Sequence, residues 1–215
     1  MQFYNLHTHN YTAKANVTEL VNQYPDSFDE SVPFWSIGVH PWRIDQQRIE
    51  DDFAVLENKL ELPGCYAIGE CGLDKRIETP LKEQLVVFER QLLLAEHYRK
   101  PVIIHCVAAF QEVIEIKKKL NITVPMIIHG FSKHMQVAES LVKNGFYISF
   151  GKYLLRNPDL EIVFKSMPDD KIFLETDTIE EEIYAVYELG AKYKNISTEQ
   201  LKAKIEDNFN FVFGK

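Results

Sequence analysis

Short runs of apolar, β-branched or aromatic residues recur along the chain and are separated by more polar segments. Most of these runs are apolar throughout, which is typical of strands in a parallel sheet that is covered on both faces. The expected strands are eight in number, and the second has the weakest pattern. They comprise residues 3–7, 17–23, 34–39, 66–70, 102–105, 124–129, 146–150 and 172–175.

Amphipathic helices are expected between the later strands. Thr79 is suited to cap a helix that has Pro80 at its first position, and apolar residues from Leu81 to Ala95 follow at helical spacing. A second helix is expected around residues 137–142, where Gly145 is placed to end it. Near the C-terminus, Ser197 and Gln200 have the spacing of a capping box.

The alternation of strands with helices predicts an α/β fold. Eight such units favour a (β/α)8 TIM-like barrel, although the length of the chain is near the lower limit for one. An open doubly wound sheet is the structural alternative, and neither of its phosphate-binding motifs, GxGxxG or GxxxxGK[ST], occurs. Because no repeat, linker or low-complexity tract interrupts the pattern, residues 1–215 are expected to form a single domain.

Composition narrows the function classes. With 24 basic and 32 acidic residues, the net charge of −8 is opposite to that of a protein that holds nucleic acid through a broad basic surface. The apolar runs are too short to span a bilayer, and the first residues do not resemble a secretory signal. Three cysteines argue against a disulfide framework. We therefore expect a cytoplasmic protein with no membrane association and no evident obligate protein partner.

The ionisable residues gather where the expected strands end, and in a barrel these ends converge on the face that carries the chemistry. His7 and His9 are two residues apart, so both imidazoles point to the same side of a strand. Glu70 lies between an apolar strand and glycines, where a buried carboxylate is costly unless it binds a cation. The full set consists of His7, His9, His40, Glu70, His105, His129 and Asp177.

Each of these residues also has a purely structural interpretation. A single histidine at a strand end is more often a hydrogen-bonded core residue, and either Glu175 or Asp177 is compatible with helix capping or charge pairing. Taken together, the imidazoles of His7, His9, His105 and His129 with the carboxylates of Glu70 and Asp177 exceed the needs of one tetrahedral zinc ion. They suit two divalent ions that share a carboxylate, and such a positive site is able to hold a phosphate.

The same residues, in the same order, resemble the motifs of the TatD family of metal-dependent hydrolases. Asn-Leu-His7-Thr-His9 is similar to the family's opening HxH, Ile-Gly-Val-His40-Pro-Trp to its GxHP and Gly-Glu70-Cys-Gly-Leu-Asp to its GExGLD. Further matches are Ile-His105, His129-Gly-Phe-Ser, Glu-Thr-Asp177 and the closing Asn208-Phe-Asn-Phe-Val-Phe-Gly. The resemblance covers essentially the whole chain.

This resemblance implies a distorted barrel, two divalent ions (Mg²⁺, Mn²⁺ or Zn²⁺) and a deoxyribonuclease that hydrolyses phosphodiester bonds of DNA. By position, His7, His9 and Asp177 would bind one ion, His105 and His129 the other, and Glu70 would bridge them. A metal-activated water would be the nucleophile, with Asp177 and Glu70 as catalytic residues. His40 would contact a substrate phosphate or support a neighbouring group.

The chain also departs from the family pattern. Asn5 stands where the family usually has Asp, and Cys106-Val-Ala-Ala109 follows His105 where an arginine often reaches a phosphate. The segment between His9 and Pro33 is short, which predicts a shortened first crossover. These departures leave two alternatives open. One is the same metal site acting on a small phosphoester, carboxylic ester or aminoacyl ester, and the other is a metal-binding protein without catalytic activity.

Overall fold

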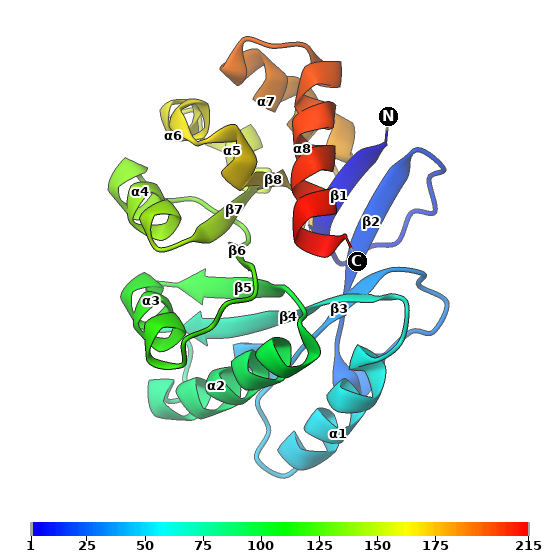
Figure 1. Ribbon diagram of the computed structural model, residues 1–215, viewed down its shortest axis with the longest axis vertical. Helices are drawn as coiled ribbons and strands as arrows, with labels where there is room; N and C mark the ends of the chain where they lie inside the picture. The colour runs from blue at the N-terminus through cyan, green and yellow to red at the C-terminus, as the bar shows by residue number, and fades with distance from the viewer. Residues whose placement is uncertain (1, 215) are drawn as a thin grey trace. The chain divides into compact units, whose positions relative to one another are not determined.

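A computed structural model describes residues 2–214 of the chain, in which strands and helices alternate (Figure 1). The strands are β1 (Phe3–Thr8), β2 (Val17–Gln23), β3 (Trp35–Ile37), β4 (Cys65–Asp74), β5 (Val102–Val107), β6 (Met126–Ile128), β7 (Phe146–Phe150) and β8 (Ile172–Leu174). The α-helices are α1 (Ile49–Leu60), α2 (Leu81–Tyr98), α3 (Phe110–Lys119), α4 (Met135–Lys143), α5 (Lys152–Arg156), α6 (Leu160–Ser166), α7 (Ile183–Lys194) and α8 (Thr198–Phe213).

The chain divides into two compact units. Unit 1 combines the two ends of the chain, up to Val21 and from Ile128 onward, and unit 2 is Asn22–Ile127. Within each unit, neighbouring strands of the sheet are parallel and follow chain order. The boundaries fall inside β2 and β6, so each of these two strands contributes residues to both units.

In unit 1, β7 pairs with β8, β1 pairs with β2, and a parallel bridge between Thr8 and Asp177 joins β1 to the residues that follow β8. Helix α8 packs against β1 and β8 (Figure 1). Its Asn208 side chain donates hydrogen bonds to the carbonyl oxygens of Asp169 (2.8 Å) and Ile172 (2.9 Å). The closing helix thereby fixes the start of the strand that leads to Asp177.

In unit 2, β4 pairs with β3 and β5, and α2 packs against β4. The buried side chain of Gln91 accepts from Val39 N (2.8 Å) and donates to Val39 O (3.1 Å), which ties α2 to the loop before His40. Gly72 has a φ of +146°, and a Cβ at this position would lie 2.0 Å from the carbonyl oxygen of His105. Glycine therefore allows β4 and β5 to approach closely beside Glu70.

All eight expected strands are present, with ends shifted by up to four residues. The shift is largest at β4, which continues from the expected end at residue 70 to Asp74. The expected helices correspond to α2, α4 and α8, and α8 has the capping box of Ser197 and Gln200. The expected cap of α2 was wrong by one residue, because Pro80 rather than Thr79 precedes the first helical residue.

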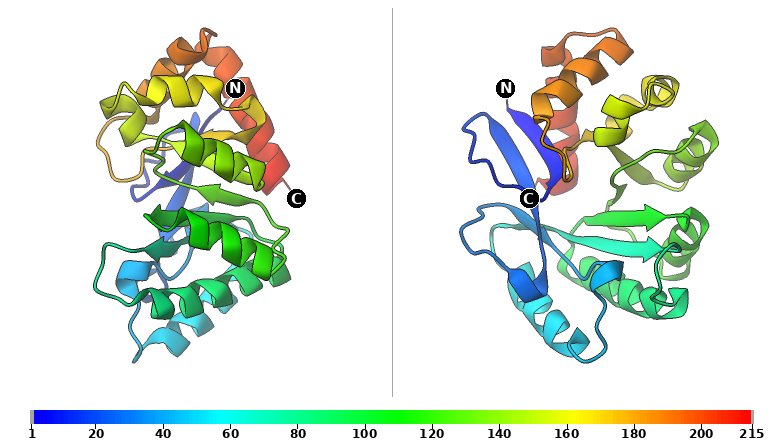
Figure 2. Two further views of the ribbon diagram at one scale, coloured as in Figure 1. Left: turned by 90° about the vertical axis from the view of Figure 1, so that its left-hand side faces the viewer. Right: turned by 180° about the vertical axis from the view of Figure 1, so that it is seen from behind.

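The first crossover is short, as the spacing of the sequence predicts, and the second is short as well. Among the described residues, no helix lies between β1 and β2, and the link from β2 to β3 contains only a 3-10 turn at Pro25–Ser27 (Figure 2). In the described part of the chain, no helix is both long enough and apolar enough to cross a membrane.

Candidate functional site

Backbone pairing in unit 1 brings the first candidate residues together. The amide of Asp177 donates to His7 O (2.9 Å), and the amide of His9 donates to Asp177 O (3.0 Å). Asp177 adopts a left-handed backbone conformation with a φ of 56°, which marks the turn away from β8. These two hydrogen bonds hold Asp177, which is distant in sequence, beside His7 and His9.

The side chains form a compact group of nitrogen and oxygen donors. Asp177 Oδ1 lies 3.8 Å from His7 Nε2 and 3.6 Å from His9 Nε2. The ring centroids of His7 and His129 are 4.3 Å apart. One donor atom each from His7, His129 and Asp177 lies within 4.8 Å of the others, a spacing that suits one metal ion.

Lys152 holds the second oxygen of Asp177. Its Nζ donates to Oδ2 at 2.7 Å. Burial opposes ionisation of Asp177, but the charges of His7 and His129 and the hydrogen bond from Lys152 outweigh it, so the pKa of Asp177 is lowered. Burial lowers the pKa of Lys152, but the hydrogen bond to Asp177 and the nearby negative charges together outweigh burial and raise that pKa. Asp177 is therefore ionised at neutral pH, with Oδ1 facing the histidines.

Two further contacts fix the segment before Asp177. The buried carboxylate of Glu175 accepts from Gly130 N (2.7 Å) and lies 3.5 Å from His129 Nδ1. The Asn5 side chain donates to Thr176 Oγ1 (2.8 Å) and accepts from Thr176 N (3.0 Å). Of the two carboxylates left open by the sequence, Asp177 faces His7, whereas Glu175 supports His129.

A second group of donors lies in unit 2, where Glu70 is within β4, His105 is within β5 and His40 is in the loop after β3. Glu70 Oε1 is 3.2 Å from His40 Nε2 and 3.0 Å from His105 Nδ1. One donor atom each from these three residues lies within 4.8 Å of the others. Glu70 and His40 are buried, and the side chain of His105 is 13% exposed.

Asp74 adds a second carboxylate to His105. Its Oδ2 lies 3.2 Å from His105 Nε2 and accepts from Trp42 Nε1 (2.8 Å), and its Oδ1 accepts from Arg76 N (2.8 Å). Burial opposes ionisation, but these hydrogen bonds outweigh it and lower the pKa of Asp74. The imidazole of His105 consequently lies between two carboxylates. Sequence reasoning missed Asp74, although it ends the Gly-Glu-Cys-Gly-Leu-Asp motif on the strand of Glu70.

The hydrogen bonds of His40 determine where its proton lies. Trp42 N donates to His40 Nδ1 at 3.1 Å, so the neutral ring carries its proton on Nε2. That N–H points toward Glu70. His40 is therefore a hydrogen-bond donor at this position.

The structure brings most of the expected residues together, but in a partly different grouping. His7, His9 and Asp177 are adjacent as expected, and His129 joins them. His40 joins Glu70 and His105. His105 and His129 belong to different units, so their assignment to one ion stays a prediction. Cys71 is buried next to Glu70, and burial raises the pKa of its thiol, which agrees with a packing role.

Comparison with known proteins identifies the family. The family model "TatD related DNase" matches residues 2–214. The "3'-5' ssDNA/RNA exonuclease TatD" of Edwardsiella piscicida is 30% identical over 78% of this chain and 64% of its own length. The "uncharacterized metal-dependent hydrolase YabD" of Bacillus subtilis is 34% identical over 66% of this chain and 57% of its own length. The chain thus spans about three-fifths of these curated relatives.

A solved structure of the TatD homolog YJJV from Escherichia coli superposes with a TM-score of 0.85, at 20% identity, over 99% of this chain and 98% of the other. This likeness, with eight strands that alternate with helices, confirms the (β/α)8 TIM-like barrel class and its shortened first crossover. Because the family model covers nearly every residue, the chain belongs to the TatD related DNase family.

Proposed function

We propose that this protein is a divalent-metal-dependent hydrolase of phosphodiester bonds, acting as a deoxyribonuclease on DNA. The observation that carries the proposal is the presence of a group of histidine and carboxylate donors in each unit. These groups are His7, His129 and Asp177 in unit 1, and His40, Glu70 and His105 in unit 2. The names of the relatives, an exonuclease and a metal-dependent hydrolase, support the same activity.

The donor set fits divalent cations. His105 has a carboxylate oxygen within 3.2 Å of each ring nitrogen, whereas a neutral imidazole carries only one N–H. If Asp74 accepts that N–H, the lone pair of Nδ1 faces Glu70, and a cation held by both atoms removes their repulsion. Nitrogen and oxygen donors of this kind accept Mg²⁺, Mn²⁺ or Zn²⁺.

We propose two bound ions, as the sequence predicts. His7, His9, His129 and Asp177 would hold metal in unit 1, and Glu70 and His105 would do so in unit 2. Sharing of Glu70 between the ions is part of this proposal. When bound, divalent ions lower the pKa of a coordinated water and polarise a phosphoryl oxygen.

The protein's own residues have distinct parts in the proposed hydrolysis. Asp177 is ionised and its carboxylate is fixed through Oδ2 by Lys152, which suits it to orient the attacking water and accept a proton from it. Glu70 is the second catalytic carboxylate in this proposal, and His40 and His105 both contact its Oε1. His40, whose Nε2–H points toward Glu70, would support that carboxylate or contact a substrate phosphate. Asp74 orients the ring of His105 through Nε2, and Glu175 lies beside Nδ1 of His129.

The experiment measures hydrolysis by metal-stripped protein to which Mg²⁺, Mn²⁺ or Zn²⁺ is restored. The substrates are end-labelled single-stranded DNA and bis(p-nitrophenyl) phosphate, a small diester. Stepwise shortening of the DNA that requires metal, and that is lost in His129→Ala, supports the proposal. Cleavage of DNA without metal, or unchanged cleavage by His129→Ala, contradicts it.

Hydrolysis of a smaller ester by the same groups is the second candidate. The net charge of −8 and the absence of an arginine directly after His105 favour a substrate with few phosphates, such as a small phosphoester, a carboxylic ester or an aminoacyl ester. Cleavage of the small diester alone would select this candidate. Metal binding without hydrolysis of any of these substrates would instead favour a non-catalytic metal-binding protein.

The proposed setting is the cytoplasm, with a DNA or phosphoester substrate and no obligate protein partner. The odd count of three cysteines supports this setting, because it is atypical of a disulfide framework. A chain adapted to an oxidising compartment would more often pair such residues.

A further inference from the structure

We propose that a pocket between α5 and residues 178–181 binds the phosphate and base of a nucleotide next to the bond that is cut. This inference rests on the proposed function, since it assigns a substrate subsite to the same enzyme. All residues of the pocket belong to unit 1.

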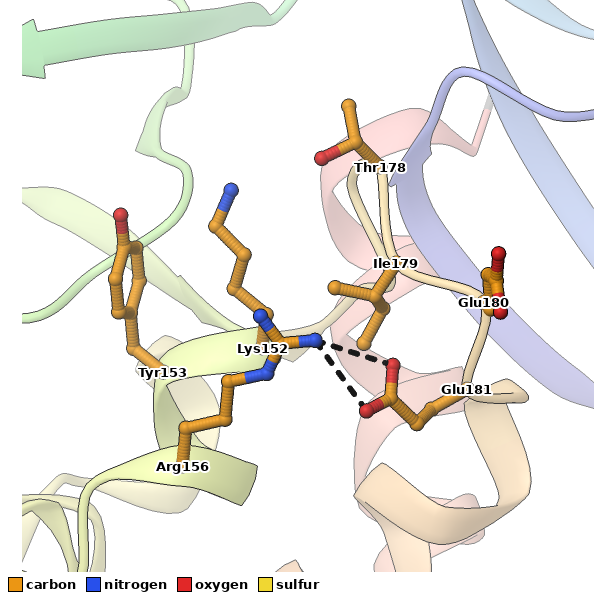
Figure 3. A pocket seen from close by; sticks show the side chains of 7 residues that line it. All are labelled: Lys152, Tyr153, Arg156, Thr178, Ile179, Glu180 and Glu181. Atoms are coloured by element: carbon orange, nitrogen blue, oxygen red, sulfur yellow. Dashed lines mark hydrogen bonds and ion pairs between the residues drawn. The ribbon is translucent and has the colours of Figure 1, made fainter.

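The pocket begins beside Asp177 and has the size of a ligand site. Its volume is about 770 Å³, within the range of roughly 300–1,000 Å³ typical of small-molecule sites. Lys152, which binds Asp177, forms part of its wall, and Thr178 follows Asp177 directly. Figure 3 shows the side chains of Lys152 and Tyr153 extending from α5 on one side and Thr178 on the other. A substrate held at Asp177 can therefore extend into this pocket.

Arg156 supplies the group that recognises a phosphate. Its guanidinium lies 3.4 and 3.5 Å from the two carboxylate oxygens of Glu181 (Figure 3), and these side chains are 60% and 45% exposed. An ion pair this long and exposed contributes little, so a phosphate can replace it. Guanidinium groups bind phosphate oxygens in a bidentate manner, and Arg156 thus provides a phosphate contact that the loop after His105 lacks.

Tyr153 supplies a surface for the base. Tyr153 is 40% exposed, and the Lys152 ammonium lies 5.3 Å from its ring centroid. Bases stack on such exposed rings with little sequence preference. Aromatic ring and guanidinium are three residues apart on the same helix, a separation that suits the base and phosphate of one nucleotide.

The acidic residues of the pocket limit how much of a nucleic acid it accepts. Glu180 and Glu181 line the same pocket, and they repel additional phosphates. The pocket therefore suits a single nucleotide near the end of a strand rather than a long duplex. Glu181 also competes with that nucleotide for Arg156, so removal of its charge is expected to strengthen binding.

The test compares two variants, one expected to raise KM and one expected to lower it, on two substrates. Arg156→Ala is expected to raise KM for a five-nucleotide single-stranded DNA by about tenfold, the loss of a charge-assisted hydrogen bond, with kcat nearly unchanged. Glu181→Gln is expected to lower that KM by roughly threefold, the scale of an exposed ion pair. Neither change should alter kcat/KM for bis(p-nitrophenyl) phosphate, because its single phosphate is the one that is cut and it has no neighbouring phosphate for Arg156 to bind. Tyr153→Phe should keep the wild-type KM, whereas Tyr153→Ala should raise it.

Arg90 and Glu50 provide matched controls. They form an exposed ion pair of 2.7 Å between α2 and α1 in unit 2, with side chains 39% and 77% exposed. Arg90→Ala and Glu50→Gln make the same charge changes in the unit that contributes no residue to the pocket, and they should leave KM for the oligonucleotide unchanged. Equal effects of the control and pocket variants would overturn the inference, because they would indicate a general charge effect.

Direct binding separates failure of the inference from failure of the proposed function. If the wild-type protein cleaves no DNA, the proposed function fails, and fluorescence anisotropy with the labelled oligonucleotide then tests the pocket alone. Weaker binding by Arg156→Ala and tighter binding by Glu181→Gln would support the pocket. Wild-type binding by both variants would overturn it.

Discussion

At the scale of single residues, Asp74 shows how a group that need not touch the substrate can determine the chemistry of a site. It accepts hydrogen bonds from Trp42 Nε1 and Arg76 N, which fix both of its oxygens, and one of these oxygens faces His105 Nε2. When this oxygen accepts the N–H of His105 Nε2, the lone pair of Nδ1 faces Glu70. Metal binding by His105, if it occurs as proposed, is therefore expected to depend on Asp74, a residue outside the candidate ligand set.

Asp74→Asn is expected to weaken metal binding by about 10–100-fold, the usual effect of removing a carboxylate behind a ligating histidine. The measurement is competition for Zn²⁺ or Mn²⁺ against a chromophoric chelator, with circular dichroism to verify the fold. Trp42→Phe removes only one hydrogen bond to Asp74 and should have a smaller effect. Unchanged metal affinity in Asp74→Asn would show that His105 needs no such support.

The sequence predicts that the candidate residues gather at one edge of the sheet, because parallel strands present their carboxyl ends together, although Glu70 and His105 lie within β4 and β5 rather than at their ends. It does not predict which of them become neighbours. His129 lies beside His7, and His40 lies beside Glu70, through side-chain directions that depend on tertiary packing. Asn5 is a further example: both atoms of its amide bind Thr176, a contact across most of the chain's length that no local pattern reveals.

At the scale of secondary structure, local signals predict some helix ends well. In α8, Ser197 Oγ accepts from Gln200 N (3.2 Å), and Gln200 Oε1 accepts from Ser197 N (2.8 Å), as the spacing in the sequence indicates. By contrast, β4 extends to Asp74 through a segment of low strand propensity. Its length depends on pairing with β5 at Gly72, Leu73 and Asp74, which is a tertiary effect.

Ser197→Ala is expected to lower the free energy of unfolding by about 1 kcal/mol, because the amide at the start of α8 loses its acceptor. Urea unfolding followed by circular dichroism measures this change. Gln200→Ala removes only the reciprocal hydrogen bond and should cost less. A Ser197→Ala variant as stable as the wild type would mean that water replaces the cap without loss.

Asp169 links a 3-10 turn (Asp169–Lys171) to α7 and α8, through ion pairs with Lys194 (2.7 Å) and Lys204 (2.8 Å). Burial opposes its ionisation, but these two lysines outweigh burial and lower its pKa. A carboxyl group with a lowered pKa in the folded state stabilises that state above the unfolded pKa of about 4. This contribution is lost as the pH falls through the folded pKa.

Asp169→Asn is therefore expected to reduce stability at pH 7 by about 1 kcal/mol, the upper range for exposed pairs. The difference from the wild type should shrink below pH 4 and vanish once Asp169 is protonated in both states. Urea unfolding at several pH values measures the difference. A difference that is constant down to pH 2.5 would contradict an electrostatic origin.

At the scale of the whole molecule, the sequence predicts one domain, and the structure contains two compact units joined through β2 and β6. Unit 1 is built from both ends of the chain, so it forms only after the entire chain is available. The two units share β2 and β6, and the two segments of unit 1 are separated in sequence by unit 2. We therefore expect both units to unfold in a single cooperative transition.

Both tryptophans, Trp35 and Trp42, lie in unit 2, which gives a direct test. Tryptophan fluorescence reports on unit 2 alone, whereas far-ultraviolet circular dichroism reports on the helices of both units. Coincident urea transitions from the two probes are expected for one domain. Separate transitions would indicate that the units unfold independently.

The central claim is that the histidine and carboxylate groups hold metal for hydrolysis, and Glu70→Ala tests it most directly. The measurement is metal-dependent cleavage of single-stranded DNA and of the small diester, with the Tm of each protein recorded alongside. We expect Glu70→Ala to lose hydrolysis of both substrates at every metal concentration while keeping a cooperative thermal transition. Full metal-dependent activity of this variant would contradict the account.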